Sequence, residues 1–198
     1  MCDKMVNSNN EIIDSIFDSS LDLISKSKEL SNIISDATDA IITSLENNGK
    51  IIIFGNGGSA ADAQHFAAEF IGRFEKERDA IPAISLTTDS SIITSIGNDY
   101  SFDKIFERQC EALIESNDII FVISTSGNST NVINGVKVAK KKNIPSIGLL
   151  GNDGGSLKDY VTTPIIIPSN STPRIQESHR IILHIICQIV ENNLSQKN

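Results

Sequence analysis

The spacing of apolar residues divides the chain into a helical first part and an alternating remainder. Between residues 11 and 45, apolar side chains recur every three or four positions, which predicts two amphipathic helices. Ser27 and Ser31 are candidate N-caps for the second helix, and Gly49 is a candidate terminator. From residue 50 onward, short β-branched runs alternate with helical patterns. The two parts are therefore expected to differ in structure.

Five short apolar runs predict strands. They lie at residues 50–54, 83–86, 118–124, 145–150 and 163–167. The runs at 50–54 and 118–124 are continuous, as is typical of buried parallel strands. Helical patterns occupy residues 60–74, 90–96, 102–114, 131–142 and 175–194. This alternation predicts an α/β fold: a three-layer αβα sandwich with a five-stranded, mainly parallel sheet, N-terminal helices and a long C-terminal helix.

The length of 198 residues fits a single domain. Residues 1–49 form its helical part, and residues 50–198 form an α/β core with the last helix. The apolar stripes of the first part and of the last helix exceed what one sheet needs, which predicts that they serve in oligomerisation. The alternative is that these helices only cover the sheet.

The charge and cysteine content exclude several classes of protein. Lys and Arg number 17 and Asp and Glu number 25, so the net charge is −8, which argues against nucleic-acid and membrane partners. No apolar stretch is long enough to span a bilayer, and the polar first ten residues do not resemble a signal peptide. Cys2, Cys110 and Cys187 offer no disulfide framework. The expected location is the cytoplasm, and a small anionic ligand stays possible.

A glycine-rich loop follows the first predicted strand. Its residues are Gly55, Asn56, Gly57, Gly58, Ser59 and Ala60. Glycines allow a ligand to approach the backbone closely, and the next helix offers free N–H groups to an anion. The string also fits a dinucleotide fingerprint, but Asp89 lies too late to be its acidic partner. A tight turn without a ligand is the alternative.

A second loop rich in hydroxyl groups follows the strand at 118–124. Its residues are Ser124, Thr125, Ser126, Gly127, Asn128 and Ser129. It has no Walker-A lysine and so is not a nucleoside-triphosphate loop. Its serines could be ordinary caps and turn formers. Because two such loops end strands of one sheet, the sequence predicts a cleft for a sugar or a phosphate.

Titratable residues recur along one stripe of each of two predicted helices. His65, Glu69 and Arg73 follow the glycine loop at intervals of four. A His/Glu pair at this spacing can share a metal or divide acid and base roles, although a surface ion pair is the alternative. The last helix carries Gln176, Arg180, His184 and Gln188 on one flank. His179, beside charged neighbours, is expected to be a bystander.

These strings together resemble the phosphosugar-isomerase (SIS) domain and, specifically, the phosphoheptose isomerase family. The matching stretches are residues 55–69, 72–73, 86–89, 96–100, 123–129 and 174–177. The resemblance covers the chain from about residue 50 to its end and implies the SIS fold. The family interconverts sedoheptulose 7-phosphate and D-glycero-D-manno-heptose 7-phosphate. This is the first step of activated-heptose synthesis for lipopolysaccharide or other bacterial surface glycans.

The resemblance also implies roles for individual residues. The phosphate is expected at Ser124, Thr125, Ser126 and Ser129. The sugar is expected to contact Asn56, Gly57, Gly58, Ser59, Glu69, Arg73, Asn98, Asp99 and Gln176. Glu69 and His184 are the implied acid/base pair. One zinc ion per subunit is implied at His65, Glu69, Gln176 and His184, with no organic cofactor.

The implied zinc ligands raise a question of geometry. Gln176 and His184 are eight residues apart, which is about 12 Å along a helix, whereas each ligand must lie about 2 Å from the zinc ion. Either the helix bends or a neighbouring chain contributes, so the resemblance predicts a homotetramer with sites at subunit interfaces. The segment from Pro168 to Arg174 departs from the family, whose members often carry acidic residues there.

Three other functions compete with an isomerase. The first is a non-enzymatic SIS-fold protein that acts through protein contacts, like the DnaA initiator-associating protein, which lacks an equivalent of His184. The second is a regulator that senses sugar phosphates, but this chain has no room for a DNA-binding domain. The third is a dinucleotide-dependent oxidoreductase, which leaves the serine-rich loop unexplained. The presence of His184 together with Glu69 favours the enzyme.

Overall fold

The computed structural model describes residues 8–195. Residues 1–7 and 196–198 are outside this range, so Cys2 and most of the segment compared with a signal peptide lie outside the described residues. Within it, Cys110 and Cys187 are buried free thiols. None of the described helices combines the length and the apolar character needed to cross a bilayer.

The sheet has five strands, and every described pairing is parallel. The strands are β1 (Ile51–Gly55), β2 (Ala83–Ser85), β3 (Ile119–Ser124), β4 (Ser146–Leu150) and β5 (Thr163–Ile166). Their order is β2-β1-β3-β4-β5. Every residue of β1 and β3 is buried, which explains why these two strands read as continuous apolar runs. The predicted α/β fold is confirmed, and the sheet is parallel throughout.

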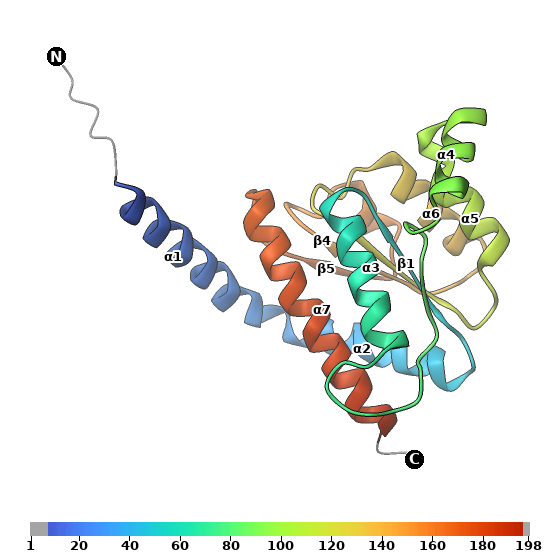
Figure 1. The fold of residues 1–198 in the computed structure, drawn as a ribbon, viewed down its shortest axis with the longest axis horizontal. Coiled ribbons are helices and arrows are strands. Elements are labelled where there is room, and N and C mark those ends of the chain that lie inside the picture. Colours follow the sequence, from blue (N-terminus) through green and yellow to red (C-terminus); the bar gives the residue numbers. More distant parts are fainter. Residues whose placement is uncertain (1–7, 196–198) are drawn as a thin grey trace.

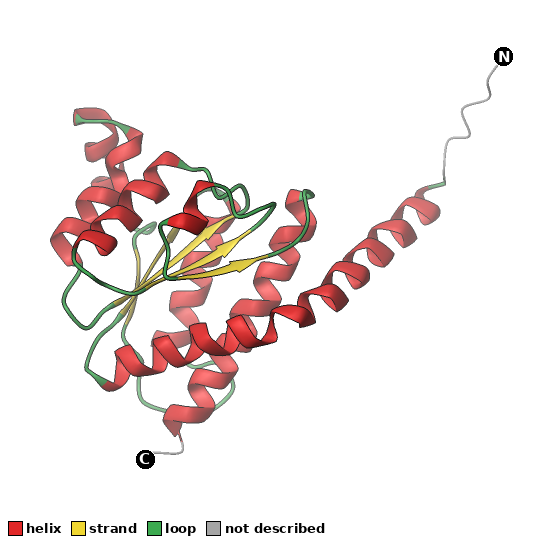
Figure 2. Ribbon diagram, turned by 180° about the vertical axis from the view of Figure 1, so that it is seen from behind, coloured by secondary structure: helices red, strands yellow, loops and turns green. Residues whose placement is uncertain are grey.

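Helices cover both faces of the sheet (Figures 1 and 2). They are α1 (Asn9–Ser27), α2 (Ser31–Glu46), α3 (Gly58–Ile71), α4 (Ser90–Asp99), α5 (Ile105–Leu113), α6 (Thr130–Lys141) and α7 (Thr172–Ser195). Short 3₁₀ turns occupy Lys28–Leu30, Phe102–Lys104 and Ser156–Asp159. One core joins α2, α3 and α7 to the sheet, and the other joins α4, α5 and α6 to its opposite face. The long C-terminal helix is therefore part of the first layer.

Two local predictions in the helical part were wrong. The N-cap of α2 is Leu30, which makes no side-chain cap bond, because the 3₁₀ turn at Lys28–Leu30 carries the chain from α1 into α2 without an extended residue. Ser31 donates its hydroxyl back to the Lys28 carbonyl instead. After α2, Asn48 rather than Gly49 takes a positive φ, of 61°. Gly49 is needed for packing, since a Cβ there would overlap the Asn117 carbonyl oxygen.

Helix α1 extends away from the body of the molecule (Figure 1). Within α1, which is described over its whole length, Leu23 is the one buried residue. Its exposed apolar side chains are Ile12, Ile13, Ile16, Phe17 and Leu21. The interpretation that the N-terminal helices only cover the sheet therefore does not hold for α1.

His179 faces the core rather than solvent. It is fully buried, and its Nε2 donates to the Leu150 carbonyl at 3.2 Å. Burial lowers the pKa of His179 to about 4, although the hydrogen bond to Leu150 partly opposes this shift. The folded protein therefore holds this ring neutral over a range in which the unfolded chain protonates it.

This buried ring should make folding sensitive to mild acid. A depressed pKa contributes stability that is complete above about pH 6.5 and is lost progressively toward pH 4; by pH 5 the loss is about 2 kcal/mol. Urea unfolding at pH 7 and pH 5 should show this loss in the wild type. His179→Gln, which keeps a donor but cannot titrate, should show a smaller difference. Equal differences in both proteins would contradict the assignment.

Candidate active site

The glycine-rich loop and the serine-rich loop follow neighbouring strands, at the point where the connecting helices switch from one face of the sheet to the other. Strands β1 and β3 are neighbours, but α3 after β1 packs on one face and α6 after β3 packs on the other. Open α/β sheets bind ligands at such a switch point, beyond the carboxyl ends of the strands. Gly57 in the first loop and Gly127 in the second both have positive φ, of 57° and 64°.

An amide pair joins the two loops. Asn56 donates Nδ2–H to Asn131 Oδ1 at 2.8 Å, and Asn131 donates Nδ2–H to Asn56 Oδ1 at 2.9 Å. Asn131 is 3% exposed and also accepts the Val132 N–H. Asn56, expected to contact the sugar, is thus held by a residue that sequence reasoning missed. The one available signal was its position just after the serine-rich loop.

The serine-rich loop is shaped by its own hydroxyl groups. The Gly127 N–H donates to Ser124 Oγ at 3.1 Å, and the Asn128 N–H donates to Ser126 Oγ at 3.2 Å. Ser129 is the N-cap residue of α6, but its side chain makes no cap bond. In these bonds the hydroxyl oxygens accept, so their hydrogen atoms are available for donation to a ligand. The N-terminus of α6 follows the loop directly and offers further N–H groups.

The segment after β4 supports this loop from outside. The Leu157 N–H donates to the Gly127 carbonyl at 2.9 Å. Asn152 Nδ2 donates to the Thr125 carbonyl at 2.8 Å, and the Ser156 N–H donates to Asn128 Oδ1 at 2.9 Å. A Cβ on Gly127 would overlap the Gly154 carbonyl. The backbones therefore touch, and the loop has little room to move.

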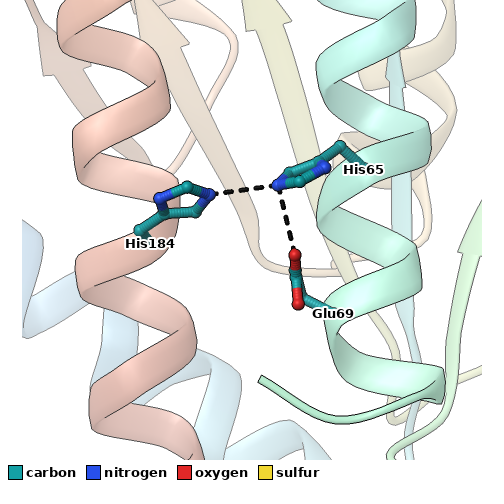
Figure 3. A group of neighbouring side chains, drawn as sticks. All are labelled: His65, Glu69 and His184. Atoms are coloured by element: carbon teal, nitrogen blue, oxygen red, sulfur yellow. Dashed lines mark hydrogen bonds and ion pairs between the residues drawn. The ribbon is translucent and has the colours of Figure 1, made fainter. Parts of the chain in front are cut away.

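Helices α3 and α7 bring His65, Glu69 and His184 together (Figure 3). His65 Nε2 lies 3.0 Å from His184 Nε2 and 3.2 Å from Glu69 Oε1. The His65 and Glu69 side chains are 36% and 21% exposed, so solvent or a small ligand can reach them. Glu69 and His65 share the i, i+4 stripe of α3, while His184 faces them from α7.

The surroundings of His184 favour its neutral form. Burial lowers the pKa of His184, and the neighbouring His65 and Arg180 lower it further. Glu69 and Asp62 act in the opposite direction without reversing the shift. A neutral imidazole keeps a lone pair, which is the form that accepts a proton or binds a metal.

The three side chains fit a zinc ion. Their ligand atoms all lie within 4.8 Å of one another. Two imidazole nitrogens and one carboxylate oxygen form a donor set typical of catalytic zinc, which keeps one position open. His65 Nε2 lies within hydrogen-bond distance of both His184 Nε2 and Glu69 Oε1, but it can donate at most one proton. A metal ion bound by all three side chains would satisfy each of them.

Gln176 lies apart from this cluster. Its side-chain amide rests against Gly58, where it would lie 2.5 Å from a Cβ. With Gly58, Asp62 and Arg180 it lines a hollow of about 440 Å³. Because α7 runs unbroken from Thr172 to Ser195, Gln176 sits two turns before His184. Its role as a zinc ligand stays a prediction.

Three further predicted site residues are also separate from the cluster. Arg73 follows the end of α3 and pairs with Glu77 at 3.1 Å in an exposed position. Asn98 and Asp99 end α4, on the other face of the sheet, where the Asn98 amide donates to Asp99 at 2.9 Å. Ser59, in contrast, is buried in the first turn of α3. The sugar-binding roles of these residues stay predictions.

The loops and the cluster are separated along α3. The helix carries the chain about 10 Å from Gly58 to His65. An open-chain sugar phosphate has its phosphate and its carbonyl group at opposite ends. The arrangement can therefore hold a phosphate at the loops while an acid and a base act at a distant carbonyl.

Comparisons with known proteins agree with this arrangement. The SIS domain family matches residues 16–151. The phosphoheptose isomerase of Citrifermentans bemidjiense is 53% identical over 85% of this chain and 88% of its own length. That of Aliarcobacter butzleri is 54% identical over 80% and 84%. The solved structure of the phosphoheptose isomerase from Neisseria gonorrhoeae is 39% identical, with a TM-score of 0.88 over 93% of this chain and all of that one.

The family match at residues 16–151 includes both loops and the whole of α3. A shared fold alone would not require identity at this level over most of each chain. The chain therefore belongs to the SIS-domain proteins and, within them, to the phosphoheptose isomerase family.

Proposed function

We propose that this protein interconverts sedoheptulose 7-phosphate and D-glycero-D-manno-heptose 7-phosphate. The convergence of His65, Glu69 and His184 is the observation that carries the proposal, because the same cluster supplies an acid/base pair and a candidate metal site. The reaction would be the first step toward activated heptose for lipopolysaccharide or another surface glycan, and would take place in the cytoplasm.

The reaction moves one proton between C1 and C2 and another between their oxygens. The Glu69 carboxylate would take the carbon-bound proton and return it to the neighbouring carbon, through an enediol or enediolate. His184, with its lowered pKa, would exchange protons with the two oxygens.

The phosphate would be held without a cationic side chain from the loop. Ser124, Thr125, Ser126 and Ser129 would donate hydroxyl protons, and the N-terminus of α6 would add its unpaired N–H groups. Asn56, Gly57 and Gly58 would line the path from the phosphate toward the cluster. Arg73, Asn98, Asp99 and Gln176 would reach the sugar of this subunit or of a neighbouring one.

The proposal includes one zinc ion per subunit and no organic cofactor. His65, Glu69 and His184 would hold the ion, and Gln176 of a second copy would be a further ligand. A bound zinc ion would polarise the carbonyl and hold the two reacting oxygens on one side. The donor set and its spacing support this part of the proposal.

The proposal also includes a homotetramer. Exposed apolar side chains on α1 and on the outer face of α7 support it. A groove of about 420 Å³ between α1, α2 and α7 is lined by Ile24, Ile34, Ile181, Ile185 and Ile189. Light scattering should report a tetramer, and a fully active monomer would contradict it.

An isomerase assay on the purified protein tests the proposal. Sedoheptulose 7-phosphate should give the aldose product, followed by NMR. Prolonged dialysis against a chelator should remove most of the turnover, and zinc should restore it, whereas magnesium should not. The absence of turnover with zinc present would overturn the enzyme assignment, and tight binding to DnaA in the same preparation would favour the non-enzymatic alternative.

A further inference from the structure

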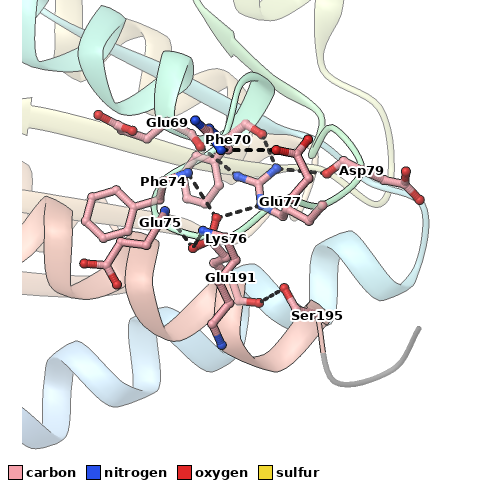
Figure 4. A network of polar contacts seen from close by, with 11 residues as sticks. Glu69, Phe70, Phe74, Glu75, Lys76, Glu77, Asp79, Glu191 and Ser195 are labelled. Atoms are coloured by element: carbon pink, nitrogen blue, oxygen red, sulfur yellow. Dashed lines mark hydrogen bonds and ion pairs between the residues drawn. The ribbon is translucent and has the colours of Figure 1, made fainter.

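A buried ion pair ties the segment between α3 and β2 to helix α7. Arg78 Nε lies 3.1 Å from Glu191 Oε1, and the two side chains are 5% and 2% exposed. We call these two residues and their hydrogen-bond partners the Arg78–Glu191 network (Figure 4). The proposed reaction does not involve this network, although the network includes the backbone of Glu69 and of residues shortly after it.

Glu191 uses both carboxylate oxygens. Oε1 accepts the Phe74 N–H at 3.0 Å, and Oε2 accepts the N–H groups of Glu75 and Lys76, each at 2.9 Å. Burial alone would raise the pKa of Glu191, but the three backbone hydrogen bonds and Arg78 outweigh it and lower the pKa. The carboxylate therefore stays ionised and fixes the path of three consecutive residues.

Arg78 fixes the end of α3. Its guanidinium donates to the carbonyls of Glu69 at 2.7 Å, Phe70 at 2.8 Å and Asp79 at 2.9 Å. The last carbonyls of a helix lack partners within the helix, and a cation there also suits the helix dipole. The backbone of Glu69 is thus held directly by Arg78.

The same segment reaches His184. The Phe74 ring lies 5.5 Å from the His184 ring, centroid to centroid. Gln188, one turn beyond His184, donates to the Glu75 carboxylate at 3.0 Å. The network therefore contacts the backbone of Glu69 on one side and the ring of His184, through Phe74, on the other.

We propose that Arg78 and Glu191 are positioning residues for the Glu69–His184 pair; this inference rests on the proposed function. Buried ion pairs are often no more stabilising than apolar side chains of similar size. Their directional hydrogen bonds fix geometry instead, and a misplacement of about 1 Å can cost about 100-fold in rate.

Glu191→Gln tests the proposal, because the variant keeps the shape but loses the charge and one acceptor. We expect kcat to fall about 10- to 100-fold. KM should stay nearly unchanged, because the phosphate loops are not touched. Zinc affinity, measured by competition with a coloured chelator, should fall about tenfold or more, as for other residues that orient metal ligands.

Asp118→Asn is the matched control. Asp118 is 1% exposed, accepts the N–H groups of Lys50 and Glu115 at 3.0 and 2.8 Å, and pairs with Lys50 Nζ at 2.8 Å. It precedes β3, at the opposite end of the strand from the serine-rich loop. Asp118→Asn should lower the unfolding midpoint but leave kcat and zinc affinity unchanged. Equal kcat values in the two variants would overturn the positioning role.

A second variant covers the case in which Glu191→Gln does not fold. Arg78→Lys keeps the charge but cannot reach all four acceptors, so it should lower kcat and zinc affinity in the same direction. An inactive wild type would refute the proposed function, and the zinc affinities would then decide the positioning role. A wild type that neither turns over substrate nor binds zinc would refute both.

Discussion

Glu69→Gln should remove isomerase activity while the protein stays folded. We expect kcat to fall about 1000-fold, within the range that general acid–base catalysis usually contributes. Glutamine has nearly the shape of glutamate, but its neutral amide cannot take the carbon-bound proton. KM should change little, because Glu69 lies about 16 Å along α3 from Gly58, away from the loops proposed to bind the phosphate. Steady-state kinetics with zinc in excess measure both constants.

Glu107→Gln is a suitable control for this variant. Glu107 pairs with Lys104 on α5, on the other face of the sheet, so the substitution changes the charge equally without touching the cluster. Its kcat should equal that of the wild type. A Glu69→Gln protein that is loaded with zinc and retains more than about a tenth of the wild-type kcat would exclude Glu69 as the base.

Gly127→Ala should cause the largest loss of stability among glycine variants of the binding loops. The residue has a φ of 64°, and its new Cβ would overlap the Gly154 carbonyl. The left-handed conformation and the overlap each cost about 1–2 kcal/mol or more. We therefore expect the free energy of unfolding to fall by about 3 kcal/mol, a large part of a typical total. Urea unfolding measures it, and binding of inorganic phosphate should weaken as well.

Variants of two other glycines help to separate the cost of the backbone conformation from the cost of the steric overlap. Gly57 also has a positive φ, of 57°, but a Cβ there would meet no atom within 4 Å. With ψ at −121°, this backbone conformation is one that side chains with a Cβ rarely adopt, so Gly57→Ala should cost about 1–3 kcal/mol from the backbone alone. Gly97 lies inside α4 with open space around it. Gly97→Ala should therefore raise the free energy of unfolding by up to about 1 kcal/mol. If Gly127→Ala costs no more than about 1 kcal/mol, which the left-handed backbone alone explains, the backbone contact with Gly154 is unimportant.

The sheet followed from the sequence because its signals are local. Continuous apolar runs marked β1 and β3, and all five predicted strands lie within one or two residues of the observed ones. The His65–Glu69 pair was also visible, as an i, i+4 spacing on one helix. His184 joined it through the family resemblance, since no local pattern relates α3 to α7.

The remaining features depend on contacts between distant parts of the chain. Asn56 and Asn131 are 75 residues apart, and Arg78 and Glu191 are 113 apart, so neither pair leaves a local pattern. The charged neighbours of His179 in sequence do not indicate that it is buried. It lies, however, four residues after Ile175 and three before Ile182, on the apolar stripe of α7 that faces the core.

The common direction of three helices has an electrical consequence. Helices α3, α6 and α7 all begin at the carboxyl edge of the parallel sheet, and each N-terminus is equivalent to about half a positive charge. A dianion at this edge meets an attractive local potential although the chain as a whole carries −8. Because that potential comes from fixed, partly buried dipoles, salt should screen it less than it screens a surface cluster of lysines.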